Sequence, residues 1–400
     1  VRFVPVETVP IEDLSKVPAD DRKVIERLVQ PNKEAGAEVV ISQHYPMHPP
    51  ALSADVGLAL LAWEESHLPP STVDLLNERF DGVLAQVRSV QKSLVDSGVW
   101  KPSALTGLPV DLKAYEGVCG RSGVAKTFLH VSSCFPRKGI DVLLTAWSRA
   151  FSDTDAVELI IKTFPNPHNN VEAQVAELRR RHPRLAPIKI INKDIPPAEL
   201  VDLFRTSDVM VLPTRGEGYN LPAMEALAAG LPLIVTGHGG HMDFCGPNEA
   251  RLLDYEFQMS ESHVKECVSC WVNPSVEDLA EALREQARPE RQAEIEARRI
   301  QGRLTARKVT DPLRWSATIS EFARTMLGPV DLGPVRTNWI STWAVRCGIA
   351  EYSRYLFEHM SSAARVEMTM LADDRVLEAP ESDEVRRLAA WRTGGNFSVR

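Results

Sequence analysis

The sequence predicts an α/β protein with doubly wound parallel sheets. Two observations carry this prediction. Apolar runs of strand length alternate with helix-compatible segments along most of the 400 residues, which is the pattern of strand–helix–strand units. Proline and glycine stand at the junctions between these segments, where helices begin and end. The length agrees with this class, because at about 150 residues per domain the chain has room for two to three domains.

The first domain is predicted over residues 1–115. Its apolar runs with strand character are 39–42, 57–63 and 82–87, and the segments 71–80 and 89–97 between and after them are polar or helix-compatible. This alternation indicates a parallel sheet. Glycine and proline recur between 107 and 123, which indicates a linker to the next sheet.

The second domain, predicted over 116–328, shows the alternation more clearly. Its predicted strands are 127–131, 157–162, 188–191, 209–212 and 233–236, and its predicted helices are 140–151, 171–181, 197–206 and 222–229. Four repeats of strand and helix predict a doubly wound sheet that binds ligands at the carboxyl ends of its strands. Three further helices, at 276–284, 289–303 and 315–326, are expected to pack back on the sheets.

A third segment begins after the glycine- and proline-rich run 327–334. Residues 335–342 and 366–372 have strand character, and 349–360 form an amphipathic helical pattern. We therefore expect the start of a further α/β unit over 335–400.

Composition limits the classes of function. A net charge of −8 and a pI near 5.8 argue against general electrostatic capture of nucleic acid, so an anionic ligand must be held locally. Six irregularly spaced cysteines favour a reducing compartment over a disulfide framework. The longest apolar run, 56–63, is far shorter than the roughly 18 to 20 residues that span a bilayer. We expect a soluble or peripheral protein and, since the chain starts at Val1 rather than Met, a piece of a longer one.

The most informative motif lies at the end of the predicted strand 209–212. A turn bracketed by glycines holds Glu217, and Pro222 opens a helix whose first turn contains Glu225. The free N–H groups of this helix start, from Asn220 onward, suit a phosphate or the polar edge of a nucleotide. Carboxylates beside an anion site are favourable where they accept hydrogen bonds from sugar hydroxyls. The motif therefore predicts a site for a phosphorylated sugar or a nucleotide.

Two other motifs follow neighbouring strands of the same predicted sheet. Arg137 and Lys138 come after 127–131, where two adjacent cations could neutralise a diphosphate. The run 236–241, Thr-Gly-His-Gly-Gly-His, comes after the last strand, and its glycines permit close backbone approach to a ligand. All three motifs follow carboxyl ends of strands, so we expect them to meet at one edge of the sheet.

Together these residues resemble the retaining glycosyltransferases of family GT4, also called group 1. The match consists of Glu217 and Glu225 in a Glu-x7-Glu motif, the upstream Arg-Lys-Gly-Ile-Asp and the downstream Gly-Leu-Pro-Leu-Ile-Val-Thr-Gly-His-Gly-Gly, over residues 115–290. The resemblance implies the GT-B fold, in which two Rossmann-like domains face a cleft. It also implies that the glycine-rich loop after the first strand is missing here, so that the first domain is truncated at its start.

The resemblance implies a role for each motif residue. Glu217 would lie beside the donor sugar, and Lys138 with Arg137 would bind the diphosphate and stabilise its departure, which makes these three the catalytic residues. Glu225 would hold the ribose. The remaining donor-binding residues would be Gly218, Tyr219, Asn220, Leu221, Gly239 and His241. No cofactor and no metal are implied, since the cations can do the work of a metal.

The function implied is a hexosyltransferase-type reaction. A nucleoside diphosphate sugar would donate its sugar, with retention, to a glycan or lipid-linked acceptor in bacterial surface polysaccharide synthesis. We expect a cytoplasmic protein with no nucleic-acid partner, compatible with peripheral association at the inner face of the membrane. Residues 338–353 resemble the glycine-rich loop of a further unit of the same family, which predicts tandem transferase units. The family's Gly-Arg pair is replaced by Ser132 and Ser133.

Several alternatives stay open at this stage. A non-catalytic unit that only holds nucleotide or glycan is the main rival to the enzyme, and an epimerase or a dinucleotide oxidoreductase lacks its motif. Glu64 and Glu65 are acceptor-side candidates, and His241 could contact the donor or order its loop. Cys267 and Cys270 form one pair with no second pair at zinc spacing, so packing is the simpler interpretation. The same holds for Trp63, Trp147 and Trp271, which we expect in the core, and for His44 and His48, which we expect in loops.

Overall fold

The structure is a computed structural model of the chain. It describes residues 22–23, 37–43, 47, 54–116, 118, 123–261, 268–327, 335–340, 366–373 and 386–391. Contacts divide the chain into two compact units, Val1–Leu327 and Gly328–Arg400. His44, His48, Cys267 and the predicted helix 349–360 lie outside the described residues.

The first sheet of the larger unit has four parallel strands in the order β1-β2-β3-β4. The strands are β1 (Ala37–Ser42), β2 (Ala54–Leu61), β3 (Gly82–Ala85) and β4 (Ser103–Leu105). Helices α2 (Pro70–Arg79) and α3 (Arg88–Asp96) connect them. The apolar runs of β2 and β3 are buried along almost their whole length, as expected for a sheet covered on both faces.

The second sheet has six parallel strands in the order β10-β9-β8-β5-β6-β7. They are β5 (Thr127–Val131), β6 (Glu158–Thr163), β7 (Ile188–Asn192), β8 (Val209–Leu212), β9 (Leu233–Thr236) and β10 (Arg251–Leu253). The chain builds outward from β5 through β6 to β7 and then returns to place β8 on the other side of β5. The loops that follow β5 and β8 therefore diverge at a topological switch point, where parallel sheets bind ligands.

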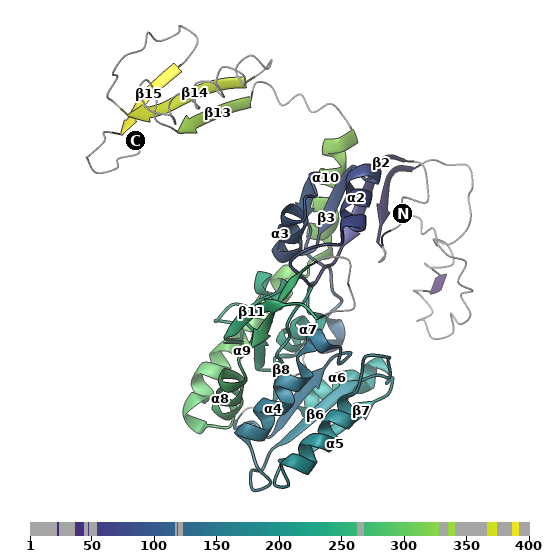
Figure 1. Ribbon diagram of the computed structural model, residues 1–400, viewed down its shortest axis with the longest axis vertical. Coiled ribbons are helices and arrows are strands. Elements are labelled where there is room, and N and C mark those ends of the chain that lie inside the picture. Colours follow the sequence, from purple (N-terminus) through teal and green to yellow (C-terminus); the bar gives the residue numbers. More distant parts are fainter. Residues whose placement is uncertain are drawn as a thin grey trace. The chain divides into compact units, whose positions relative to one another are not determined.

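Helices cover both faces of this sheet (Figure 1). One face packs on α4 (Ile140–Ala150), α5 (Val171–Arg181) and α8 (Val276–Gln286), with Trp147 fully buried at the centre of that core. The other face packs on α6 (Pro197–Thr206) and α7 (Leu221–Ala229), in a core that continues to α2 and α3 of the first sheet. The apolar core on this second face thus runs from one sheet to the other, while the core beneath α4, α5 and α8 is separate.

The last two helices of this unit pack on elements that come earlier in the chain. Helix α9 (Gln292–Val309) lies against α7, and α10 (Pro312–Leu327) packs on the remaining face of the first sheet. In Figure 1, α10 accordingly lies beside β2 and β3. Ile319 and Ala323 of α10 meet Leu58 and Leu84 there. The sequence-based expectation that these helices pack back on the sheets is confirmed for α10, whereas α9 packs on helix α7.

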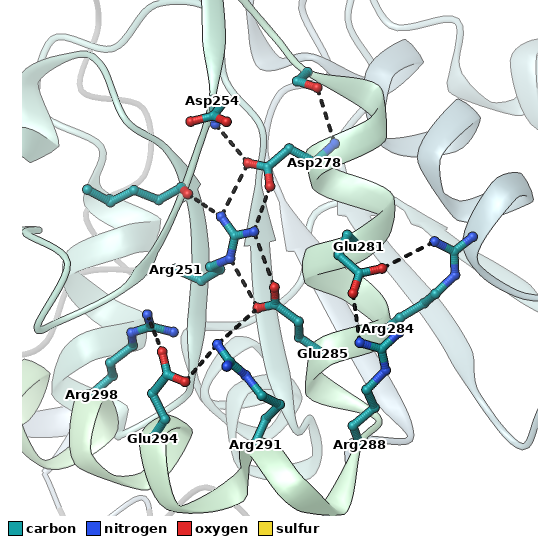
Figure 2. A network of polar contacts seen from close by, with 12 residues as sticks. Arg251, Asp254, Asp278, Glu281, Arg284, Glu285, Arg288, Arg291, Glu294 and Arg298 are labelled. Carbon is teal, nitrogen blue, oxygen red and sulfur yellow. Dashed lines mark hydrogen bonds and ion pairs between the residues drawn. The ribbon is translucent and has the colours of Figure 1, made fainter.

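An ion-pair network joins β10 to α8 (Figure 2). The Arg251 guanidinium donates to Asp278 over 2.6 Å and to Glu285 over 3.1 Å, and all three side chains are largely buried. Arg291, just before α9, pairs with Glu294 and approaches Glu285 at 4.0 Å. Paired geometry of this kind is specific because the guanidinium fork matches two carboxylates. The network fixes α8 and the start of α9 at the edge of the sheet.

The antiparallel hairpin formed by β11 (Tyr255–Met259) and β12 (Cys270–Pro274) is an addition to the alternating pattern. The sequence-based interpretation missed it and placed no strand between 236 and 276.

In the second unit, β13 (Val335–Ile340), β14 (Val366–Asp373) and β15 (Arg386–Trp391) form a parallel sheet in that order. Its first two strands were predicted.

Removing packing at the α10 interface tests this arrangement. We expect Ile319→Ala to lower the free energy of unfolding by about 2 to 5 kcal/mol, because it leaves a cavity between α10 and the first sheet. Leu313→Ala is the matched control on the same helix, since Leu313 is 77% exposed and such a site changes stability by about 0.5 kcal/mol or less. Urea unfolding followed by tryptophan fluorescence measures both. Equal effects of the two substitutions would contradict the packing of α10.

Candidate functional site

Two loops meet at the switch point between β5 and β8. The β5 loop ends in a 3₁₀ turn, Pro136–Lys138, closed by Gly139 with a left-handed φ of 65°. A Cβ at position 139 would lie 1.9 Å from the carbonyl oxygen of Pro213 in the β8 loop. Glycine is therefore required here both for its backbone conformation and for the close approach of the two loops.

The loops bring a buried ion pair together. The Lys138 ammonium donates to both carboxylate oxygens of Glu217, over 2.7 and 2.8 Å. Arg137 lies 3.5 Å from the same carboxylate and donates to the Gly216 carbonyl over 3.2 Å. The other Arg137 nitrogen lies 3.1 Å from Glu64, which follows β2 of the first sheet. The three residues predicted as catalytic and one acceptor-side candidate thus form one cluster, the ion cluster.

The charges of the ion cluster depend on one another. Burial raises the pKa of Glu217, but the charges of Lys138 and Arg137 outweigh it and hold that pKa below its usual value. Burial lowers the pKa of Lys138, and the Glu217 carboxylate opposes this effect. Glu217 is therefore ionised at neutral pH, and the loss of either partner would leave an uncompensated charge in the interior.

Arg215 positions the two loops, a role that the sequence-based interpretation did not assign. Its guanidinium donates to both oxygens of Asp141 over 2.7 Å and to the Pro136 carbonyl over 2.8 Å. Its backbone N–H donates to the Arg137 carbonyl over 2.7 Å, and its carbonyl accepts from Val272 of β12. The sequence offered one signal for this role: an arginine lies two residues before Glu217, and an aspartate that could pair with it lies three residues after Lys138.

The loop after β9 closes over Glu217 from another side. The Gly240 N–H donates to the Glu217 carbonyl over 2.8 Å, and Gly239 lies against the Glu217 side chain. His241 is fully buried and hydrogen-bonds through Nε2 to the Thr236 carbonyl over 2.6 Å. Burial lowers the pKa of His241. These contacts favour the loop-ordering interpretation of His241 over direct donor contact.

Glu64 and Glu65 separate in the structure. Glu64 faces the ion cluster, and its carbonyl oxygen would lie 2.3 Å from a Cβ at Gly216. Glu65 is buried and accepts from the Ser260 hydroxyl over 2.7 Å, so it holds the segment after β11. The adjacent Ser66 also pairs with β12, since its N–H donates to the Cys270 carbonyl over 3.0 Å. The hairpin therefore contacts the loop after β2.

The start of α7 shows how the other predicted donor residues lie. Asn220 caps the helix in a left-handed conformation, with φ 76°, and accepts from the Ala223 N–H. Leu221 is exposed, whereas Tyr219 is buried against Phe244. Gly218 packs against the backbone of residue 63.

Glu225 lies on α7 and takes no part in the hydrogen bonds and ion pairs described for the ion cluster. Burial raises the pKa of Glu225, and a hydrogen bond with Tyr115 opposes that rise. Tyr115 belongs to the short turn Lys113–Tyr115 in the connection between the two sheets. The structure therefore brings Lys138, Arg137, Glu217 and Glu64 together and places Glu225 with the connecting segment.

The described residues contain no group of three or more His, Cys, Asp or Glu side chains arranged to hold a metal ion. In the same part of the chain, no helix has both the length and the apolar character needed to cross a bilayer. Cys134, Cys245 and Cys270 are free thiols. Trp63, Trp147 and Trp271 are buried as expected.

Comparison with known proteins gives a family match to the region that carries the site. Residues 125–285 match the family described as Glycosyl transferases group 1. The chain is 31% identical over 142 residues to the MMP alpha-(1->4)-mannosyltransferase of Mycolicibacterium hassiacum, which covers 35% of this chain and 33% of that protein. The chain spans about a third of the length of the curated relatives that it matches first.

The similarity to solved structures extends beyond residues 125–285. A UDP-forming α,α-trehalose-phosphate synthase from Burkholderia xenovorans has a TM-score of 0.55 at 16% identity, covering 77% of each chain. The Anabaena protein HepE, solved in complex with UDP and glucose, has a TM-score of 0.53 at 13% identity, covering 68% of this chain and 72% of that one. The larger unit therefore has the GT-B fold that the motif resemblance implied.

His130 allows a test of how the stability of the protein depends on pH. It is fully buried on β5, where Nδ1 lies 2.8 Å from the Val211 carbonyl and Nε2 lies 2.7 Å from the Ser132 hydroxyl. Burial lowers its pKa from 6.5 to about 4. As the pH falls, the imidazole of His130 is therefore protonated near pH 6.5 in the unfolded chain but only near pH 4 in the folded protein. The stability contributed by the neutral ring is complete above pH 6.5 and is lost as the pH falls toward 4.

Between pH 7.5 and pH 5 the free energy of unfolding of the wild type should fall because of His130. We expect this fall to be about 2 kcal/mol smaller in His130→Gln, at 1.36 kcal/mol per pKa unit. Urea unfolding at the two pH values measures this loss. The exposed His182 provides the control, because His182→Gln leaves the buried ring in place. The assignment fails if His130→Gln and the wild type lose the same stability on acidification.

Proposed function

We propose that the protein is a glycosyltransferase that takes a sugar from a nucleoside diphosphate sugar and transfers it to a glycan or lipid-linked acceptor. The observation that carries the proposal is the ion cluster, in which Lys138 and Arg137 pair with the buried Glu217 at the topological switch point of a parallel sheet. This is the place where such sheets bind ligands. The match of residues 125–285 to group 1 glycosyltransferases supports it.

The cations fit the leaving group of this reaction. During transfer, the bond between the anomeric carbon and the diphosphate oxygen breaks, and its electron pair moves to the diphosphate. Lys138 and Arg137 would stabilise this growing negative charge from fixed positions, which is the most effective form of electrostatic catalysis. Because these cations can take the place of a metal, we propose a metal-independent reaction. The UDP in the structure of HepE supports a nucleotide as the leaving group.

The carboxylates fit the sugar. Once the diphosphate pairs with the cations, the Glu217 carboxylate is released to accept hydrogen bonds from donor hydroxyls and to stabilise positive charge at the anomeric carbon. Glu64 reaches the same cluster from the first sheet, so we place the acceptor on its side. Its carboxylate can accept a hydrogen bond from the acceptor hydroxyl that attacks the sugar. Glu225 is proposed to hold the ribose in exchange for its bond to Tyr115.

We further propose retention of the anomeric configuration and a role in bacterial surface polysaccharide synthesis, at the cytoplasmic side of the membrane. The Escherichia coli serotype-specific mannosyltransferase WbdA supports the second point, since it is 28% identical over 130 residues, which cover 32% of this chain and 15% of that protein.

Glu217→Gln separates binding from catalysis. We expect the substitution to lower sugar transfer by at least about 100-fold, because it removes charge that acts on the transition state. We expect nucleoside diphosphate affinity to stay equal or to rise, since Lys138 and Arg137 lose their competing carboxylate. Release of nucleoside diphosphate from a panel of nucleotide sugars measures transfer, and calorimetry measures binding.

Glu177→Gln is the matched control, because Glu177 pairs with arginines on the exposed surface of α5. Wild-type turnover by Glu217→Gln would refute the assigned role. Nucleotide binding without any release of nucleoside diphosphate by the wild type would instead favour the non-catalytic binding unit.

A further inference from the structure

Lys162 is a largely buried cation at the carboxyl end of β6. Its backbone pairs with Val131 of β5 on one side and with Ile191 of β7 on the other. Only 8% of the residue is exposed. The sequence indicated only that Lys162 ends a strand. A lysine in that position is commonly exposed to solvent, so nothing in the sequence singled it out.

The ammonium of Lys162 has few partners. It donates to the Thr163 carbonyl over 2.8 Å, and among the residues that the structure describes it forms no ion pair within 4.0 Å. An ammonium carries three donors, so two are left for other groups. Burial lowers its pKa, and the more distant Asp194 and Cys134 only partly oppose this effect. Lys138, by contrast, has both oxygens of a carboxylate.

Lys162 lies next to the loop that carries the ion cluster. The Ser132 N–H donates to the Lys162 carbonyl over 3.1 Å, which places the two strand ends side by side. From Ser132 the chain runs through the left-handed Cys134 to Arg137 and Lys138. The residues paired with Lys162, Val131 and Ile191, pack into the core on the face covered by α6 and α7. Lys162 is thus a cation at the same sheet edge, one strand beyond the cluster.

We infer that Lys162 binds a phosphate oxygen of the donor nucleotide, as a third cation beside Arg137 and Lys138. The inference rests on the proposed function and specifies its substrate site further. A largely buried ammonium without a counter-ion is stabilised when an anion supplies the missing charge and accepts its free N–H groups. Arg137 and Lys138 are already paired with carboxylates, whereas Lys162 offers its charge without first losing a partner.

The test compares Lys162→Met with the wild type in binding UDP, GDP, ADP and dTDP by calorimetry. Loss of one charge-assisted hydrogen bond should weaken the best-bound diphosphate by roughly 10- to 100-fold. Lys162→Arg keeps the charge and should retain more of the affinity. Lys189→Met is the matched control, because Lys189 is an exposed lysine on the neighbouring strand β7.

Two further measurements exclude a merely structural role. The thermal midpoint of unliganded Lys162→Met should equal or exceed that of the wild type, because the substitution removes a buried charge that lacks an ion pair. The affinity for the corresponding nucleoside, which has no phosphate, should be unchanged. A lower midpoint, or an equal loss of nucleoside affinity, would overturn the assignment.

The outcomes separate this inference from the function on which it rests. A wild type that binds none of the four diphosphates would overturn both. A wild type that binds one of them, with Lys162→Met binding it within about twofold, would overturn the role of Lys162 and leave the proposed function standing.

Discussion

The ion pair between Lys138 and Glu217 is the interaction on which the arrangement of the site depends. Each charge is buried and is stable there only because the other is present. The two residues come from loops that lead to helices on opposite faces of the sheet, α4 and α7, so the pair also joins the two halves of the switch point. Arg215 adds a second connection between the same loops through Pro136 and Asp141. The positions of the two cations are therefore fixed by contacts within the protein itself.

Close backbone packing explains why glycines accompany the charged residues. Positions 139, 216 and 240 each bring a backbone carbonyl of another loop within 2.3 Å of where a Cβ would stand. Any side chain at these positions would push the loops apart and lengthen the Lys138–Glu217 contact. The glycines thus strengthen the ion pairs indirectly, because they let oppositely charged residues on separate loops reach hydrogen-bonding distance. Flexibility of the turns is not needed to explain them.

The sequence predicted the second sheet well because its signals are local. Strands β8 and β9 and helices α5 and α6 have the predicted bounds, since each is an apolar or amphipathic run closed by proline, glycine or a cap. The hairpin of β11 and β12 was missed because its pairing depends on contacts with the loop after β2. The positions of Arg215 and Lys162 depend in the same way on neighbouring strands and loops. The domain boundaries and the roles of the individual site residues stay predictions.

The charge balance of the ion cluster determines what a ligand bound there must do. Arg137 and Lys138 face Glu64 and Glu217, so the ion cluster has two positive and two negative charges. In the function proposed above, a diphosphate would pair with these cations by displacing carboxylates, and the displaced carboxylates would then be free to accept hydrogen bonds from hydroxyl groups. The pairing within the ion cluster holds the loops in place. In the proposed reaction the same pairs would also supply both halves of the site, the cations for the leaving group and the carboxylates for the sugars. Lys162 stands outside this balance, since among the described residues it forms no ion pair within 4.0 Å, and by the inference above it would add to the attraction of the sheet edge for an anion.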